Sequence, residues 1–384
     1  MKIRTTLMSA LLATSALANE AFFKTEVVDA IAAPKAPTTP GDAAWGKASA
    51  KRFLVSAQRT IFLHDRTANA ILTQPAKRHI EVKAIVGDDA LAVRLEWEDT
   101  ARDVIRDDEV NAFADSVALE TPQVFGPGKR LPAISMGDDE AFVNVTLLRA
   151  TKSGALESQF AAAGFGSLTR QAPATPNDDA ISWDEANKRW SAVIRLPRAH
   201  AQALTPVAFA TWDGARRERS GYKRLSSWHF VRLPGQAPDA SYVKEVSWGF
   251  APGDLGDKEQ GRTLAEQVCI ACHRLPGKAF APAGIAPNLE NIGAIATPTY
   301  LRDSIVTPSQ VIIHEPNPNQ HYSPSAERDP NGAAPNSDGF RWSSVGPDGK
   351  RVSKMPPFAA FTPQQVADLV AFLRTLDEPT PEPR

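Results

Sequence analysis

Apolar and polar residues alternate in short runs over the first 240 positions of the chain, a pattern that predicts β-strands. Residues 80–86 and 91–97 both alternate in this way, and Gly87-Asp88-Asp89 between them is a turn sequence. Together they predict a β-hairpin with one buried face. Similar runs predict further strands at 116–120, 142–148, 190–196, 207–212 and 227–233. Strands at this spacing, separated by Gly, Pro and Asp turns, are typical of an antiparallel β-sandwich.

The pattern becomes helical near residue 257. Residues 257–269 predict one helix. Near the other end, Thr362 is placed to cap a second helix, with Pro363 at its first position and Gln365 completing a capping box. One face of that helix is apolar and carries Val366, Leu369, Val370, Leu373 and Leu376. Residues 315–350, rich in Pro, Asn, Ser and Gly, predict a long surface loop.

These patterns predict two domains in the mature chain. A mainly-β antiparallel sandwich is expected over 19–240, a linker over 241–256, and an all-α domain over 257–384. Residues 1–18 have basic Lys2 and Arg4, a short apolar run and a small-residue cleavage site. They predict a signal peptide, because the apolar run is too short to cross a bilayer. No membrane span is expected in the mature chain.

The charge balance argues against one class of partner. Loss of Lys2 and Arg4 with the signal peptide takes the 43 basic residues to 41, against 44 acidic residues. The mature chain is therefore slightly acidic. Such a balance is not typical of a protein that binds nucleic acid or an anionic membrane.

The only two cysteines of the chain stand in Cys269-Ile-Ala-Cys272-His273. A redox dithiol would need a βαβ setting, and none surrounds the motif. A zinc site would need further Cys or His at ligand spacing. Cys-x-x-Cys-His is the attachment signature of c-type haem: two thiols in one helical turn reach both vinyl groups, and the histidine ligates the iron. The motif predicts one covalent haem c, which is attached outside the cytoplasm, so we expect a periplasmic protein.

Residues 257–378 resemble a class I cytochrome c. The resemblance implies thioether bonds to Cys269 and Cys272, with His273 as the proximal ligand. It also implies that Met355, in Lys354-Met355-Pro356, is the distal ligand, and such a His/Met pair raises the reduction potential. Pro287 matches the proline whose carbonyl receives the proximal imidazole N–H.

Two features of this domain leave alternatives open. His314 is a rival distal ligand or a surface histidine. The loop 315–350 is longer than in the minimal cytochrome fold. It could cover a gap between two haems, dock a partner, or be a solvated insertion.

Dispersed motifs of the first domain carry a second resemblance. They are Asp42-Ala-Ala-Trp45, Leu95-Glu-Trp-Glu-Asp99, Leu131-Pro-Ala-Ile-Ser-Met136-Gly137-Asp138, Thr211-Trp-Asp-Gly-Ala215 and the stretch 217–228. Over about residues 35–235 they resemble the haem b-binding, gamma-type subunit of type II dimethyl sulfoxide reductase-family enzymes such as ethylbenzene dehydrogenase.

This second resemblance implies one non-covalent haem b between Met136 and Lys223. A lysine can ligate iron only as the neutral amine, so its pKa must lie well below the usual value of about 10.4. Without the resemblance, Met136 would be interpreted as a core residue and Lys223 as an exposed lysine in a basic run. The strand after Met136 lacks the tryptophans expected there. Four histidines are alternatives with a weaker case: His64, His79, His200 and, nearest the lysine motif, His229.

The whole chain is therefore expected to be a dihaem electron-transfer protein rather than an enzyme, similar to the third subunit of some nitrite oxidoreductases. Expected partners are molybdenum and iron–sulfur subunits and a soluble cytochrome or other redox partner. One alternative is a small-molecule dehydrogenase that uses haem c as its electron acceptor, although no catalytic constellation is visible. Another is a haem-free β-sandwich that docks the cytochrome to a partner.

Overall fold

The structure is a computed structural model that describes residues 20–58, 77–106, 109, 111–164, 167–278, 286–312 and 342–377. The predicted signal peptide, His64, His314 and most of the predicted loop 315–350 lie outside the described residues. Within the described part of the chain, no helix is long and apolar enough to cross a membrane.

The first domain is one large, mainly antiparallel β-sheet, where the alternating pattern predicted a β-sandwich. Its central order is β10-β8-β7-β6-β13-β14-β3-β4-β5-β12-β11, and all pairs are antiparallel except β1–β15 and β2–β4. The strands are β1 (Val27–Asp29), β2 (Ile31–Ala32), β3 (Lys51–Ala57), β4 (Lys77–Val86), β5 (Ala90–Glu98), β6 (Ser116–Pro122), β7 (Val143–Ala150), β8 (Ala155–Ala162), β9 (Thr169–Arg170), β10 (Thr175–Asn177), β11 (Ile181–Asp184), β12 (Arg189–Pro197), β13 (Leu204–Trp212), β14 (Arg224–Leu225) and β15 (His229–Arg232). Each predicted strand is present, so the mainly-β antiparallel prediction is confirmed.

The predicted hairpin shows how the local sequence sets the register. β4 and β5 pair with Val86 opposite Leu91, and the Gly87 N–H donates to the Ala90 carbonyl at 2.8 Å. A side chain at Gly87 would come within 2.3 Å of the Ala36 nitrogen, so only glycine fits this turn. The buried face of the hairpin joins side chains from β6 and β13 in one core, which shows that the sheet curls over a common interior.

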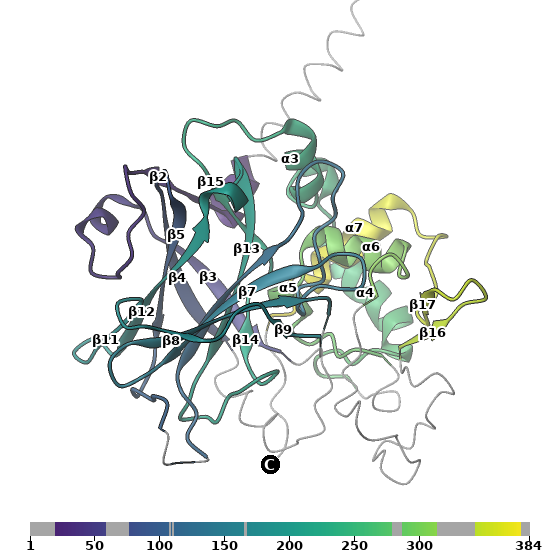
Figure 1. Cartoon of the computed structure of the whole chain (residues 1–384). Coiled ribbons are helices and arrows are strands. Elements are labelled where there is room, and N and C mark those ends of the chain that lie inside the picture. Colours follow the sequence, from purple (N-terminus) through teal and green to yellow (C-terminus); the bar gives the residue numbers. More distant parts are fainter. Residues whose placement is uncertain are drawn as a thin grey trace, which may run out of the picture.

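The second domain is built from short helices packed on α7 (Pro363–Leu373) (Figure 1). The others are α4 (Lys258–Val268), the 3-10 turn η4 (Cys269–Ala271), α5 (Ile292–Ile295) and α6 (Pro298–Val306). Both predicted terminal helices are present, and the capping box between Thr362 and Gln365 forms. A Cβ atom at Gly261 would lie 1.8 Å from the Asp368 carbonyl oxygen, so glycine lets α4 lie directly on α7.

Two observations refine the predicted domain plan. A small antiparallel hairpin, β16 (Ser343–Val345) with β17 (Arg351–Ser353), interrupts the all-α pattern expected after residue 257. The stretch expected to be a linker contains α3 (Ala240–Val246). Tyr242 and Val243 of α3 are buried in a cluster with Phe22 and Phe230, so this helix is docked on the first domain.

The helical domain lies against one face of the sheet, with α5 next to the strands (Figure 1). The contact is apolar. It places Ala118, Ala210, Trp212 and Leu225 of the first domain in one cluster with buried side chains of α5, α6 and α7. We call these four residues the outer-face cluster, because their neighbours in the strands point into the core on the opposite face. Both candidate sites adjoin this contact.

Candidate functional site

The Cys-x-x-Cys-His motif directly continues the helix α4. After Val268 the chain tightens into η4, and the His273 N–H donates to the Cys269 carbonyl at 2.8 Å. Cys269 is half-buried and Cys272 is exposed, and both are free thiols. Burial, and then the neighbouring Cys272, raise the pKa of Cys269 to about 11. The motif thus presents two thiols and an imidazole from a single turn of chain.

His273 is held in the orientation that an iron ligand needs. Its Nδ1 atom lies 2.8 Å from the Pro287 carbonyl oxygen and must donate to it, which leaves Nε2 free to bind a metal. Burial lowers the pKa of His273, which favours the neutral imidazole that ligates metals. The contact is the one that the cytochrome resemblance implies for Pro287.

The distal candidate Met355 lies just after β17 on a separate segment. It is half-buried, and its backbone N–H donates to the Ser353 hydroxyl at 3.1 Å. Three residues later, the Phe358 N–H donates to the Ile305 carbonyl at 3.1 Å and so attaches this segment to α6. Met355 is therefore carried by a segment anchored on the helix that follows α5.

Met136 has an unfavourable backbone conformation, which the hydrogen bonds of its loop maintain. Its φ is 74°, in the left-handed region that residues with a side chain rarely adopt, and Gly137 follows with φ 80°. Asp138 organises the loop, because its carboxylate accepts two hydrogen bonds from Arg130 at 2.6 and 2.8 Å and one from the Ala133 N–H at 3.0 Å. Met136 itself is buried against Ala208 and Trp228.

Lys223 is buried, with 7% of its surface exposed, and is not the solvated lysine that its basic neighbourhood suggests. Its Nζ atom lies 5.5 Å from the centre of the Trp212 ring. Burial lowers the pKa of Lys223, and the nearby Glu120 offsets part of this effect. A lysine in such a place is poised to be the neutral amine that can bind iron.

The register of the strands brings Met136 and Lys223 toward one face of the sheet. Glu120 pairs with Ala208 across β6 and β13, and directly paired residues share a face. Ala208 belongs to the same buried cluster as Met136, and Glu120 interacts electrostatically with Lys223. The two candidate ligands thus flank Glu120 on the same side of the sheet as the outer-face cluster.

Two buried side chains that the sequence did not single out lie at this face with unpaired polar atoms. Both amide atoms of Gln58 and one carboxylate oxygen of Glu120 lack a hydrogen-bond partner among the described residues. Burial raises the pKa of Glu120. Buried polar atoms without a hydrogen-bond partner destabilise a protein. The short side chains of Ala118, Ala208 and Ala210 keep this face of the sheet flat. These features fit a planar group with polar substituents. A charged residue inside the apolar strand β6 was the only signal in the sequence.

The three histidine alternatives of the first domain that the structure describes are placed elsewhere, and His64 lies outside the described residues. The His229 ring is stacked on Phe53 with 3.8 Å between ring centres, and its Nδ1 lies 2.9 Å from a Glu26 carboxylate oxygen. His79 and His200 are exposed, on β4 and on a 3-10 turn respectively. The structure thus brings Cys269, Cys272, His273 and Pro287 together at one site, and it places Met136 and Lys223 at the same face of the sheet.

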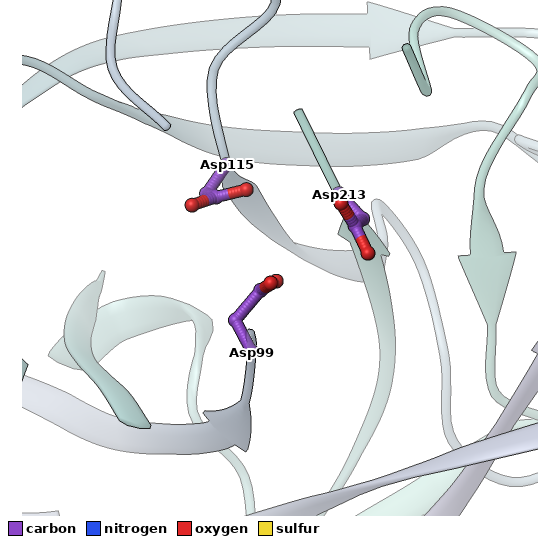
Figure 2. A group of neighbouring side chains, drawn as sticks. All are labelled: Asp99, Asp115 and Asp213. Atoms are coloured by element: carbon purple, nitrogen blue, oxygen red, sulfur yellow. The ribbon is translucent and has the colours of Figure 1, made fainter. Parts of the chain in front are cut away.

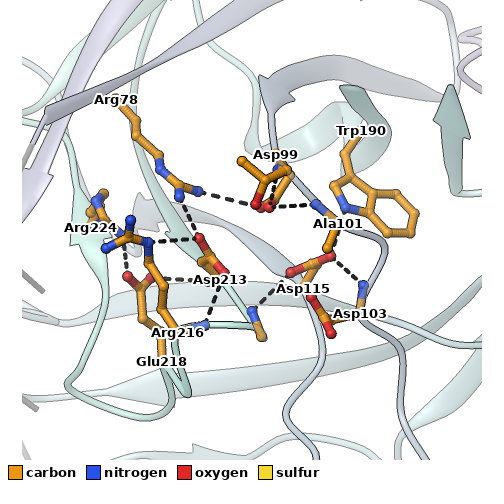
Figure 3. A network of polar contacts seen from close by, with 12 residues as sticks. Arg78, Asp99, Ala101, Asp103, Asp115, Trp190, Asp213, Arg216, Glu218 and Arg224 are labelled. Carbon is orange, nitrogen blue, oxygen red and sulfur yellow. Dashed lines mark hydrogen bonds and ion pairs between the residues drawn. The ribbon is translucent and has the colours of Figure 1, made fainter. Parts of the chain in front are cut away.

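A buried acidic cluster was also missed by the sequence reasoning. Asp99, Asp115 and Asp213 point toward one another, with ligand atoms all within 4.8 Å (Figure 2). Each stands at the end of a strand, so only the sheet topology reveals that they meet. Arg78 pairs with Asp99 and Asp213, and the indole of Trp190 donates to Asp115 at 2.9 Å (Figure 3).

The charge of this cluster is only partly balanced. Burial, and then the charge of Asp99, raise the pKa of Asp115 to about 8. Burial and the charge of Asp213 also raise the pKa of Asp99. The cluster therefore holds a proton near neutral pH, which lets it bind the ends of β5, β6 and β13 together.

Comparisons with known proteins agree with this two-part arrangement. Residues 258–377 match the family model of cytochrome c. The gamma subunit of chlorate reductase from Ideonella dechloratans is 29% identical over 204 residues, covering 50% of this chain and 81% of its own length. The gamma subunit of dimethylsulfide dehydrogenase from Rhodovulum sulfidophilum is 28% identical over 222 residues, covering 54% and 78% respectively.

Two further proteins are similar over comparable lengths. A protein of Haloferax mediterranei that carries the name of a respiratory nitrate reductase haem subunit is 27% identical over 234 residues, covering 58% of this chain and 78% of its own length.

Among solved structures, a family 9 carbohydrate-binding module from Caldicellulosiruptor kristjanssonii in complex with glucose covers 56% of this chain at 10% identity, with a TM-score of 0.26. That score is too low to support any conclusion. The sequence comparisons confirm the predicted resemblance: a gamma-type subunit of the dimethyl sulfoxide reductase family, followed by a cytochrome c domain.

Proposed function

We propose that this chain is a periplasmic dihaem electron-transfer protein, one subunit of a molybdenum oxidoreductase complex. It would relay electrons between an iron–sulfur subunit and a soluble cytochrome or other partner. The observation that carries the proposal is the contact of His273 with Pro287, inside a domain that matches cytochrome c and packs on the face carrying Lys223. The relatives support the complex, because two carry the names of gamma subunits of chlorate reductase and dimethylsulfide dehydrogenase, and one that of a haem subunit of a respiratory nitrate reductase.

At the helical site, four residues would hold one covalent haem c. Cys269 and Cys272 would form thioether bonds to the two vinyl groups. His273 would bind the iron through Nε2, while the Pro287 carbonyl fixes the imidazole tautomer and orientation. Met355 would be the other protein ligand of the iron, and a His/Met pair favours a relatively high reduction potential. A haem so bound supplies one-electron chemistry.

At the sheet, Met136 and Lys223 would bind one non-covalent haem b. Burial favours the neutral amine of Lys223. The left-handed backbone of Met136, held by the Asp138 loop, directs a thioether to a fixed place. Gln58 and Glu120 have the orphaned polar atoms that a bound cofactor or its ordered water would satisfy.

Isolation of the tagged chain from the periplasm of its native host tests the complex. We expect a molybdenum subunit and an iron–sulfur subunit to co-purify with it in fixed ratio. Recovery of the chain alone, with its haem complete and no molybdenum, would contradict its assignment as a subunit.

A further inference from the structure

One buried side chain, Asn291, joins the helical domain to the sheet. Asn291 has no exposed surface and stands just before α5. Its Nδ2 donates to the Ser56 hydroxyl at 3.1 Å and to the Ala57 carbonyl, both at the end of β3. The Ser56 hydroxyl in turn donates to the Asp377 carbonyl at 3.4 Å, after α7. Asn291 is therefore a fully buried amide that bridges the two domains beside their apolar contact, together with the bond from Ser56 to Asp377.

On the sheet side, this bridge leads directly to Lys223. Ala57 pairs with Arg224, the residue after the lysine. The backbone N–H of Gln58 donates to the Lys223 carbonyl at 3.0 Å. The strand end that accepts from Asn291 is thus bonded to the backbone of the candidate haem b ligand itself.

On the helical side, the bridge leads to His273. Asn291 ends a short segment that begins at Pro287, whose carbonyl accepts from His273 at 2.8 Å. The same segment is tied to the residue after the histidine, because the Leu289 N–H donates to the Arg274 carbonyl at 3.1 Å and Arg274 pairs with Glu290 at 3.0 Å. Only three residues therefore lie between Pro287, which contacts the proximal histidine, and Asn291, which bridges the domains.

We propose that Asn291 is a positioning residue that fixes the haem c ligand segment against the Lys223 strand and thereby sets the rate of electron transfer between the two haems. This inference rests on the proposed function. In that transfer one electron would pass from the reduced haem to the oxidised haem, with no bond formed or broken. The rate then depends on the separation and orientation that the protein imposes.

The geometry explains why one amide can have this effect. The contact also contains an apolar cluster, and apolar contacts are not directional. The hydrogen bonds of a buried amide are directional, and loss of Asn291 would leave the Ala57 carbonyl without this buried donor. We expect the relative position of the two domains to shift, so that the Ala57 carbonyl can accept a hydrogen bond from another donor.

Flash photoreduction of haem c in the full chain, followed at the α bands of both haems, tests the inference. In Asn291→Leu we expect the inter-haem rate to fall by on the order of tenfold, since a misplacement of about 1 Å can cost a reaction up to about a hundredfold. Both reduction potentials and both spectra should stay those of the wild type, because no ligand is touched. The matched control is Asn187→Leu on the exposed β11–β12 turn, which should keep the wild-type rate.

A wild-type rate in Asn291→Leu with both haems bound would overturn the positioning role and leave the proposed function intact. Absence of haem b from the wild-type protein would instead overturn the proposed function. If Asn291→Leu does not accumulate with both haems, Ser56→Ala decides, because it removes one acceptor and keeps the Ala57 carbonyl. A measurable fall in its inter-haem rate supports the inference, and an unchanged rate contradicts it.

Discussion

The two residues proposed to bind haem b are both held in unfavourable states. Met136 has a positive φ, and such a backbone costs about 1–3 kcal/mol for a residue other than glycine. Lys223 is buried where its pKa is lowered, with Glu120 as a charged neighbour. Strain and buried charge tend to persist where function needs them, so both observations point to the same face of the sheet.

Lys223→Ala tests the lysine ligand. We expect the affinity for haem b to fall at least about tenfold, since even residues that merely support a metal ligand contribute this much. The reduced spectrum should lose its b-type band and keep its c-type band. Lys244→Ala, on the exposed side of α3, is the control and should keep both. An unchanged b-type spectrum in Lys223→Ala would reject this residue as a ligand.

Met355→His tests the distal ligand of haem c. Replacing a His/Met pair with two histidines should lower the reduction potential by on the order of 0.1 V, within the range of about 0.8 V that axial ligands span. Spectroelectrochemical titration of the c-type band measures it. An unchanged potential would mean that Met355 does not bind the iron and that His314 or an open position takes its place.

Among the elements, the acidic cluster ties three strand ends together in a pH-dependent way. Asp99 and Asp115 have raised pKa values in the folded protein, and that of Asp115 is about 8. The same carboxyl groups release their protons at about pH 4 in the unfolded chain. Between these two pH values, the folded protein therefore binds more protons than the unfolded chain does. Stability from this cluster is therefore present below pH 4 and is lost as pH rises toward 8. Each proton involved changes the free energy of unfolding by up to about 1.4 kcal/mol per pH unit.

Asp99→Asn should flatten this pH dependence. The asparagine oxygen can still accept from the Thr100 N–H, as the Asp99 carboxylate does at 2.7 Å, and its amide group places a donor beside two carboxylates. We expect the variant to be more stable than the wild type at pH 8, with the difference shrinking toward pH 4. Urea unfolding at several pH values measures this. A difference that does not change with pH would contradict the buried-proton account.

The Met136 loop depends on a glycine that follows the methionine. A Cβ atom at Gly137 would lie 2.7 Å from the Ala141 carbonyl oxygen, and φ there is 80°. Gly137→Ala should lower the free energy of unfolding by about 1–3 kcal/mol and weaken haem b binding. In Gly46→Ala, where a Cβ meets nothing within 4 Å, we expect a change within about 0.5 kcal/mol. Equal effects in chemical denaturation would contradict the strained-loop account.

At the scale of the whole molecule, local sequence patterns predicted the helices and strands. The residues that meet at each candidate site depend on strand pairing and domain packing between distant parts of the chain. The β4–β5 hairpin, the capping box at Thr362 and the haem-attachment turn depend on residues a few positions apart, so the sequence alone predicts them. Asn291 and Ser56 are 235 residues apart, and their contact depends on how two domains pack. Gln58 and Glu120 are ordinary polar residues until the sheet register buries them beside Lys223.

The same reasoning explains the linker and the acidic cluster. A short stretch between two domains, with one short helix, gives no signal that Tyr242 will be buried in the first domain. Asp99, Asp115 and Asp213 come from three strands whose neighbours are set by the order of the sheet. The resemblance to known subunits supplied Met136 and Lys223, which periodicity alone would have assigned to the core and the surface.

The central claim is that one chain carries two haems of different attachment. Extraction with acidified acetone, followed by pyridine haemochrome analysis of extract and residue, measures both per chain. The account predicts one extractable haem b and one haem c that stays with the protein. Covalent haem alone, with no b-type haem in the extract of the intact native protein, would contradict it and leave the sheet domain as a haem-free docking module.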